Sequence, residues 1–127
     1  MDPAEFLDGG AVSVSDATYA VCRTDGDHPG AFATVREAEE TTVVVEECEV
    51  DAVDADAVEP GWRRLTFEME LPFELVGFLA AVATALAEVD VSVFVVSSYA
   101  TDHVFVGEED LSAAARRLEE LGCEVDG

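Results

Sequence analysis

In the second half of the chain, the spacing of the hydrophobic residues changes from that of a strand to that of a helix. This change constrains the fold more than any other feature of the sequence. It begins with large apolar residues that alternate with polar ones, as in a strand with one buried and one wet face. These residues are Leu65, Phe67, Met69 and Leu71. Apolar residues then recur at the spacing of one face of an amphipathic helix. They are Leu75, Leu79, Val82 and Leu86. The switch predicts a strand followed directly by a helix that ends within residues 88–90.

The rest of this half completes a pattern of six elements. A segment that is apolar on both faces predicts a second strand at 91–96, and a short connection leads to a third at 102–106. A second amphipathic helix follows, capped by Asp110 or Ser112 and stopped by Gly122, before a short last strand. This order is that of the ferredoxin-like βαββαβ unit, an α+β fold with two helices on one face of an antiparallel sheet.

In this topology the first and third strands are central and the second, 91–96, is an edge. An uncharged edge strand that is apolar on both faces promotes aggregation unless something covers it. We therefore expect another module beside it, either the first part of the chain or a second subunit in a homodimer or larger assembly.

The first part of the chain is strand-rich, and a division is expected near Glu59-Pro60-Gly61. Apolar and β-branched residues predict strands at 11–15, 18–23 and 41–45, whereas 32–40 is ambiguous between a strand and a helical turn. Residues 46–56 are densely acidic and suggest a solvated linker. We expect two domains, 1–59 and 60–127. A faint similarity between residues 41–47 and 102–108 suggests that the first part is a degenerate copy of the second part that has lost its long helix.

The charge balance excludes several classes of partner. The chain has 29 Asp plus Glu against 6 Lys plus Arg, for a net charge of −23, and all six cations are Arg. No basic patch for nucleic acid or for an anionic membrane can be assembled, and no apolar run is long enough to span a bilayer. The many negative side chains repel one another in dilute buffer, and molar salt screens this repulsion. The sequence suggests a halophile and a cytoplasmic location. The alternative, an acidic site for cations or a basic partner, is less favoured because the carboxylates are spread along the chain.

Motifs for catalysis, metal and cofactor binding are absent. Cys22, Cys48 and Cys123 form no CxxC pair and are expected to be buried and reduced. The glycine-rich nucleotide motifs and GxSxG are missing. A nucleophilic Cys–His pair remains an alternative, although the spacing of these residues does not indicate one. We expect no enzyme activity, no metal and no cofactor.

Two motifs resemble a known family. Gly61-Trp62 leads the strand that continues into the 71–80 sequence LPFELVGFLA, and the 93–106 sequence VFVVSSYATDHVFV follows. Together they resemble an ACT domain, most closely the tandem ACT proteins related to the arginine sensors of animal cells. Ala100, His103 and Ser98 depart from that subgroup's usual Asp, aromatic residue and Thr. The resemblance implies a shorter, degenerate ACT-like unit followed by a regular one, and binding of a small molecule, often an amino acid, between ACT units without catalysis.

The start of the first long helix is a candidate ligand site. Gly77 has no Ser, Thr, Asp or Asn at a plausible cap position. The first-turn N–H groups of Gly77, Phe78 and Leu79 and the positive helix end suit a carboxylate. The alternatives are that Gly77 is itself an acceptable cap or that Glu74 folds back as one.

The strand connection that follows the helix is the second half of the candidate site. It is rich in hydroxyl groups, and Asp102 could pair with a ligand ammonium. The residues are Ser97, Ser98, Thr101 and Asp102. The alternative is that they form a hydrogen-bonded turn. Trp62 is expected to be a hydrophobic anchor over the sheet end. His103 is expected to be a packed histidine or a halophile surface substitution, and not a ligand contact.

Three readings of function follow. The favoured one is a non-enzymatic regulatory module for an amino acid. The runner-up is an interaction module without a ligand, and a small enzyme is the least favoured.

Overall fold

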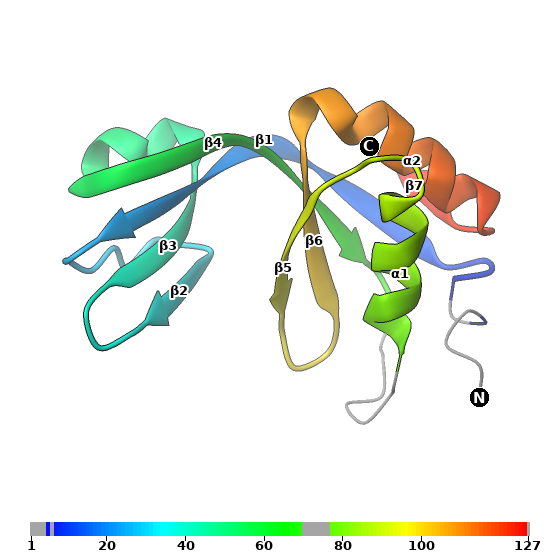
Figure 1. Cartoon of the computed structure of the whole chain (residues 1–127), viewed down its shortest axis with the longest axis horizontal. Coiled ribbons are helices and arrows are strands. Elements are labelled where there is room, and N and C mark those ends of the chain that lie inside the picture. Colours follow the sequence, from blue (N-terminus) through cyan, green and yellow to red (C-terminus); the bar gives the residue numbers. More distant parts are fainter. Residues whose placement is uncertain (1–4, 6, 70–76, 127) are drawn as a thin grey trace. The chain divides into compact units, whose positions relative to one another are not determined.

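The computed structural model describes residues 5, 7–69 and 77–126. Contacts divide the chain into two compact units, a larger one of residues 1–16 with 63–127 and a smaller one of 17–62. Figure 1 labels the elements along the chain. The strands are β1 (Ala11–Thr24), β2 (Ala33–Arg36), β3 (Thr41–Glu46), β4 (Ala55–Phe67), β5 (Val93–Ser97), β6 (Asp102–Gly107) and β7 (Glu124–Asp126). The helices are α1 (Phe78–Ala87) and α2 (Leu111–Glu120), with short 3-10 helices η2 (Glu47–Ala52) and η3 (Glu108–Asp110).

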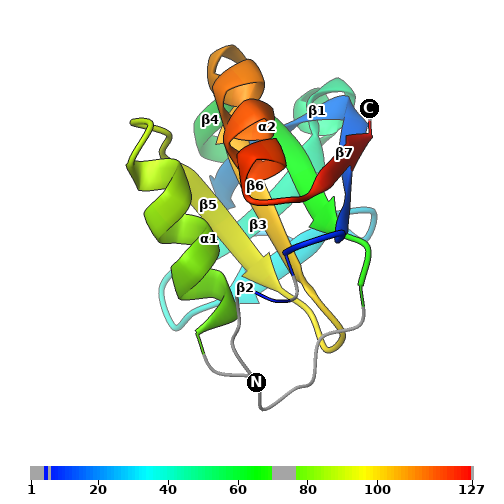
Figure 2. The ribbon, with the colours of Figure 1, turned by 90° about the vertical axis from the view of Figure 1, so that its right-hand side faces the viewer.

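The larger unit has the expected α+β architecture. Its strands follow the order β5-β6-β4-β1-β7, with β5 and β6 antiparallel, so β5 is an edge and β4 and β6 are internal, as expected. Both α-helices lie on the same face of this sheet (Figure 2). The core between them includes Leu65 and Phe67 from β4 and Val82 and Leu86 from α1. These four residues belong to the two apolar patterns of the sequence. Leu71 and Leu75 lie outside the described residues.

The beginning of β1 occupies a place that the sequence did not predict. It lies between β4 and β7, and β7 pairs with it in parallel, with Ala11 opposite Glu124. The Glu68 N–H donates to the Ala11 carbonyl at 2.8 Å, and the Glu124 N–H donates to the Gly10 carbonyl at 2.8 Å. The last strand therefore finds its hydrogen-bond partners on β1 and not on the first strand of its own half.

The division of the chain also differs from the expected one. Glu59-Pro60-Gly61 lies inside β4, and the compact units separate at 16/17 and 62/63, whereas we expected 1–59 and 60–127. The two strands expected at 11–15 and 18–23 are one continuous strand. The acidic stretch is no linker: it forms η2 and the start of β4. The Val53 N–H donates to the Val50 carbonyl at 3.0 Å within this stretch, and β4 pairs with β1, neither of which composition alone reveals.

The two α-helices end close to where the sequence predicted, α1 at Ala87 and α2 just before Gly122. Asp110, and not Ser112, stands at the N-cap position of α2, without a side-chain capping bond. Gly122 adopts a φ of +100° directly after the helix ends, a conformation that glycine reaches without strain. Arg117 ties α2 to the end of α1 by donating to the Ala85 carbonyl at 3.3 Å and to the Glu88 carboxylate at 2.7 Å.

The smaller unit has no α-helix among its residues, all of which the structure describes. Its strands follow the order β2-β3-β1-β4, and β1 pairs with β3 in antiparallel register, with Tyr19 opposite Glu46. A small core is formed by Ala20, Cys22, Val43 and Val45. The segment 32–40, which was ambiguous, contains β2. The β2–β3 hairpin is followed by η2 as the β5–β6 hairpin is followed by η3.

The three cysteines divide into two kinds. Cys22 and Cys123 are buried, as expected, and burial raises the pKa of both thiols. Cys48 is exposed on η2, so the expectation that all three are buried is wrong there. Within the described residues no helix is long and apolar enough to cross a membrane.

Candidate ligand-binding site

The start of α1 is built around a left-handed glycine. Gly77 has φ +89° and ψ −3°, stands at the N-cap position, and has no side-chain capping bond. Its carbonyl accepts the first helical hydrogen bond, from the Ala81 N–H at 3.0 Å. The first turn carries no acidic residue, so the positive end of the helix dipole is not offset by a side chain of that turn. An exposed glycine backbone at this position suits the close approach of a carboxylate.

The next two residues fix this helix end to the core. Phe78 is 3% exposed, and its ring packs edge to face on Phe67 at a centroid distance of 5.3 Å. Leu79 is half-buried and packs against the same core. Their side chains therefore hold the helix in place, and only their backbone groups are available for the role that the sequence assigned to them.

The β5–β6 connection is a hydrogen-bonded turn. The Ser97 hydroxyl donates to the Asp102 carboxylate at 2.6 Å, and the Ser98 hydroxyl donates to the Thr101 carbonyl at 2.9 Å. The Thr101 hydroxyl donates to the Phe67 carbonyl at 2.9 Å, which fastens the turn to β4. The alternative of a locally bonded turn is therefore supported. Each hydroxyl oxygen can still accept a hydrogen bond, and Asp102 keeps its carboxylate at the edge of the turn.

The topology brings the two halves of the candidate site to one end of the larger unit. The chain passes along α1 away from Gly77 and returns along β5 to Ser97, so the helix start and the hairpin turn share an end (Figures 1 and 2). A ligand carboxylate at the helix start and an ammonium near Asp102 would both lie at this end.

A histidine next to Asp102 adds a polar contact that the sequence did not indicate. His103 is half-buried, and its Nδ1 lies 3.1 Å from the Thr66 hydroxyl oxygen on β4. Burial and the nearby Arg64 lower the pKa of His103, while Asp102 and Glu68 partly oppose this shift. The neutral imidazole is the form that the fold favours. This supports the expected packing role, with one hydrogen bond across the strands.

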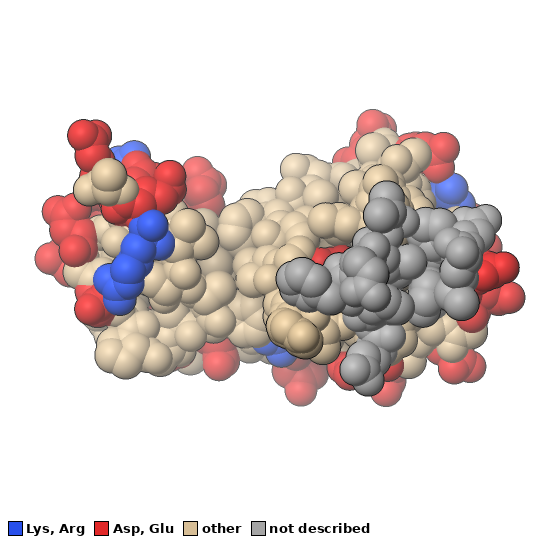
Figure 3. Space-filling view, turned by 90° about the horizontal axis from the view of Figure 1, so that it is seen from below, with Lys and Arg blue, Asp and Glu red and all other residues tan. Residues whose placement is uncertain are grey.

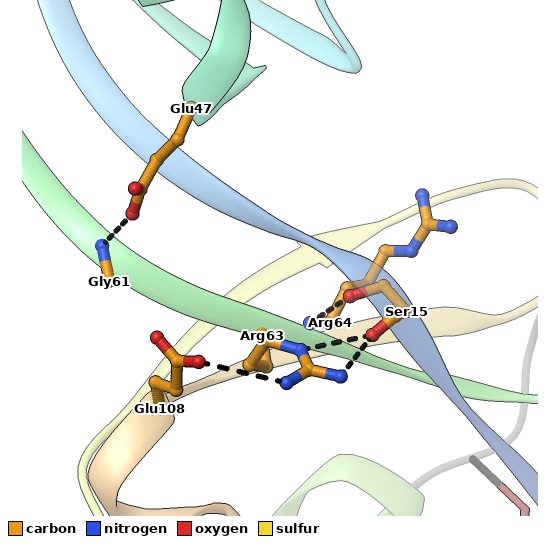
Figure 4. Close-up of polar contacts among 6 residues, drawn as sticks. All are labelled: Ser15, Glu47, Gly61, Arg63, Arg64 and Glu108. Atoms are coloured by element: carbon orange, nitrogen blue, oxygen red, sulfur yellow. Dashed lines mark hydrogen bonds and ion pairs between the residues drawn. The ribbon is translucent and has the colours of Figure 1, made fainter.

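Two arginines of β4 are held by one residue of β1, as Figure 4 shows. The Arg63 guanidinium donates to the Ser15 carbonyl, with Nε at 3.0 Å, and the Arg64 N–H donates to the Ser15 hydroxyl oxygen at 3.0 Å. Arg63 also lies 3.9 Å from a Glu108 carboxylate oxygen. The sequence did not predict these contacts, because Ser15 and the two arginines are far apart in the chain. They are structural contacts that join β1 to β4.

The larger unit has the architecture of a small α+β module, and the comparison with known families agrees. The family model for the ACT domain, a regulatory ligand-binding module, matches residues 57–120, just over half of the chain. The protein belongs to the ACT domain family. A search of curated proteins found no match.

Solved structures share the fold over nearly the whole chain. A protein from Agobacterium tumefaciens is 22% identical, with a TM-score of 0.78 and 92% of both chains covered. A Vibrio cholerae protein of unknown function, described as a possible transport protein, is 28% identical, with a TM-score of 0.73 and 94% of both chains covered. The regulatory subunit of aspartate kinase from Thermus thermophilus is 13% identical, with a TM-score of 0.67, and the match covers 91% of this chain and 97% of that subunit.

Proposed function

We propose that this protein is a non-enzymatic regulatory module that binds an amino acid where one ACT unit meets another. The observation that carries the proposal is the exposed, left-handed Gly77 at the N-cap position of α1, at the same end of the unit as Asp102. The backbone N–H groups of Gly77, Phe78 and Leu79 would hold the ligand carboxylate. Asp102, or a hydroxyl oxygen of the β5–β6 turn, would hold the ammonium.

We also propose a tandem arrangement, with residues 1–59 derived from a degenerate ACT-like unit and 60–127 from a regular one. Its support is a partly matching order of elements: β1, the β2–β3 hairpin and η2 in the first part correspond to β4, the β5–β6 hairpin and η3 in the second. In the first half a short loop stands between β1 and β2, where the second half has α1. Membership of the tandem subgroup related to animal arginine sensors is part of this proposal.

We propose the cellular environment and the oligomeric state of the protein from its net charge and its edge strand. The net charge of −23 without lysine favours the cytoplasm of a halophile. The edge strand β5 favours a homodimer or larger assembly, which would supply the second ACT unit beside the ligand.

The test is a calorimetric and thermal-shift screen of the common amino acids at high salt. Gly77→Ala should weaken binding by crowding the carboxylate. Gly9→Ala is the matched control, because Gly9 has a similar φ of +78° and open space around its Cβ position. Asp102→Ala should weaken binding by ten- to a hundredfold, the equivalent of about 1.5–3 kcal/mol for a charge-assisted hydrogen bond. If no amino acid binds, or if the folded variants bind as well as the wild type, the site is wrong.

A second candidate function has its own support. The hydroxyl groups of Ser97, Ser98 and Thr101 all donate within the chain, as they would in an interaction module that needs no ligand. A negative screen together with a stable assembly would favour this reading.

A further inference from the structure

The smaller unit contains a pocket that the proposed function does not use. It has a volume of about 200 Å³ and is lined by Tyr19, Gly30, Phe32, Glu46 and Glu49. Pockets for drug-sized ligands are larger, about 300–1,000 Å³, so this one suits a small head group. We propose that it binds a small organic cation, a primary ammonium or a guanidinium group.

The wall of the pocket is aromatic. The rings of Tyr19 and Phe32 meet edge to face, with centroids 5.9 Å apart and an interplanar angle of 66°. Phe32 is held in place by its backbone, since its N–H donates to the Val44 carbonyl at 2.7 Å. Aromatic faces attract cations through the negative charge of the π system, and more strongly where water is partly excluded.

The opposing charges are two carboxylates from different elements. Glu46 ends β3 directly opposite Tyr19 in the strand register, so both side chains project from the same face of the sheet. Glu49 comes from η2, and its Oε1 lies 3.5 Å from the Nε2 of His28 and 3.3 Å from the Cβ position of Gly30. The absence of a side chain at Gly30 therefore leaves room beside this carboxylate.

The arginines of this unit are engaged elsewhere. Arg23 pairs with Asp56, and Arg36 pairs with Asp27. These are the only two arginines among residues 17–62, so the smaller unit offers no arginine to Glu46 or Glu49. Figure 3 shows blue arginine atoms beside red carboxylates on the surface of the smaller unit. The sequence predicted a solvated linker at 46–56, whereas the fold places Glu46 and Glu49 around a pocket that two aromatic rings also line.

The experiment is an NMR titration of the full chain with n-butylammonium and n-butylguanidinium, at pH 8 and a constant KCl concentration of about 2 M. High salt suppresses the non-specific attraction of cations to an acidic surface. The uncharged probe n-butanol is the control for apolar binding. We expect the amide signals of Gly30, Phe32 and Glu46 to shift with both cations, with millimolar affinity, and not with n-butanol.

Matched variants separate the pocket from the overall charge. Glu46→Gln and Glu49→Gln should each weaken binding by roughly three- to tenfold, as expected for loss of one charged hydrogen-bond partner. Gly30→Val, which narrows the pocket, should abolish the shifts. Glu37→Gln and Glu39→Gln change the net charge equally on exposed residues outside the pocket and should change affinity by less than about twofold.

Three outcomes would overturn the proposal: no shifts up to about 50 mM cation, equal shifts with n-butanol, or equal weakening by the pocket and control variants. The result is independent of the amino-acid site, because Gly77 and Asp102 belong to the larger unit. Variants at those two residues should leave the cation titration unchanged.

Discussion

The Ser97 hydroxyl donates to the Asp102 carboxylate at 2.6 Å, and these two residues are the last registered pair of β5 and β6. The carboxylate proposed to receive a ligand ammonium is thus already the acceptor that closes the hairpin. Only one lone pair of the carboxylate is used by this bond, so the two roles are compatible in geometry. They can be separated by changing the donor and the acceptor in turn.

Ser97→Ala should leave the fold intact and loosen only the turn. The bond is exposed, and water can replace the hydroxyl, so the free energy of unfolding should fall by less than about 1 kcal/mol. Amide exchange at Ser98, whose N–H donates to the Thr101 carbonyl at 2.9 Å, should become faster. Amino-acid binding should survive, in contrast to Asp102→Ala. A loss of binding in both variants would mean that turn geometry, and not the Asp102 charge, matters.

Stability should rise with salt. The 29 acidic residues repel one another in dilute buffer, and the Debye length falls to about 3 Å at 1 M salt. Thermal midpoints measured from about 0.1 to 3 M KCl should increase throughout this range. A flat or falling midpoint would contradict the halophile proposal.

Self-association should depend on β5. Val96→Lys places a charge on the edge strand, opposite His103 of β6, and should shift the assembly toward monomer in light scattering at high salt. Val89→Lys is the control, because Val89 is 37% exposed beyond the end of α1. Circular dichroism checks that both variants are folded. A wild-type monomer, or a dimer unaffected by Val96→Lys, would show that β5 is not the interface.

The cysteines should react in a fixed order. Cys48 is exposed, whereas burial both shields Cys22 and Cys123 and raises the pKa of their thiols, which lowers the thiolate fraction. With iodoacetamide at pH 8, mass spectrometry should find Cys48 modified first and the other two only after unfolding. Cys48→Ser should leave the native protein nearly unreactive. Equal rates at all three sites would contradict this burial pattern.

His103 should contribute a pH-dependent stability. Its pKa is lowered in the folded state, first by burial and then by Arg64, so folding favours the neutral imidazole. The contribution is therefore fully present above the unfolded pKa of about 6.5 and is lost as the pH falls from there through the lower pKa of the folded state. His103→Gln removes this titration, so the stability difference between pH 8 and pH 5 should be smaller than in the wild type. Equal differences in denaturant unfolding would show that the His103 shift is negligible.

The sequence determined most elements of the larger unit because their signals are local. The alternation at Leu65 and Phe67 marks β4, and the stripe through Val82 and Leu86 marks α1, whichever residues pack against them. Gly122 marked the end of α2 in the same way. The sequence also marked Gly77 as a helix start without a Ser, Thr, Asp or Asn cap, but its left-handed conformation was not predicted.

Only the tertiary structure decided which strands pair. The contact of Ser15 with Arg63 joins residues 48 positions apart, and the place of β1 between β4 and β7 depends on such long-range hydrogen bonds. No local pattern encodes them, because any strand offers the same backbone groups to a neighbour. The tertiary structure also decided that Tyr19 and Glu46 lie together. Neither residue is distinctive in the sequence, and the antiparallel register of β1 and β3 brings them together beside one pocket.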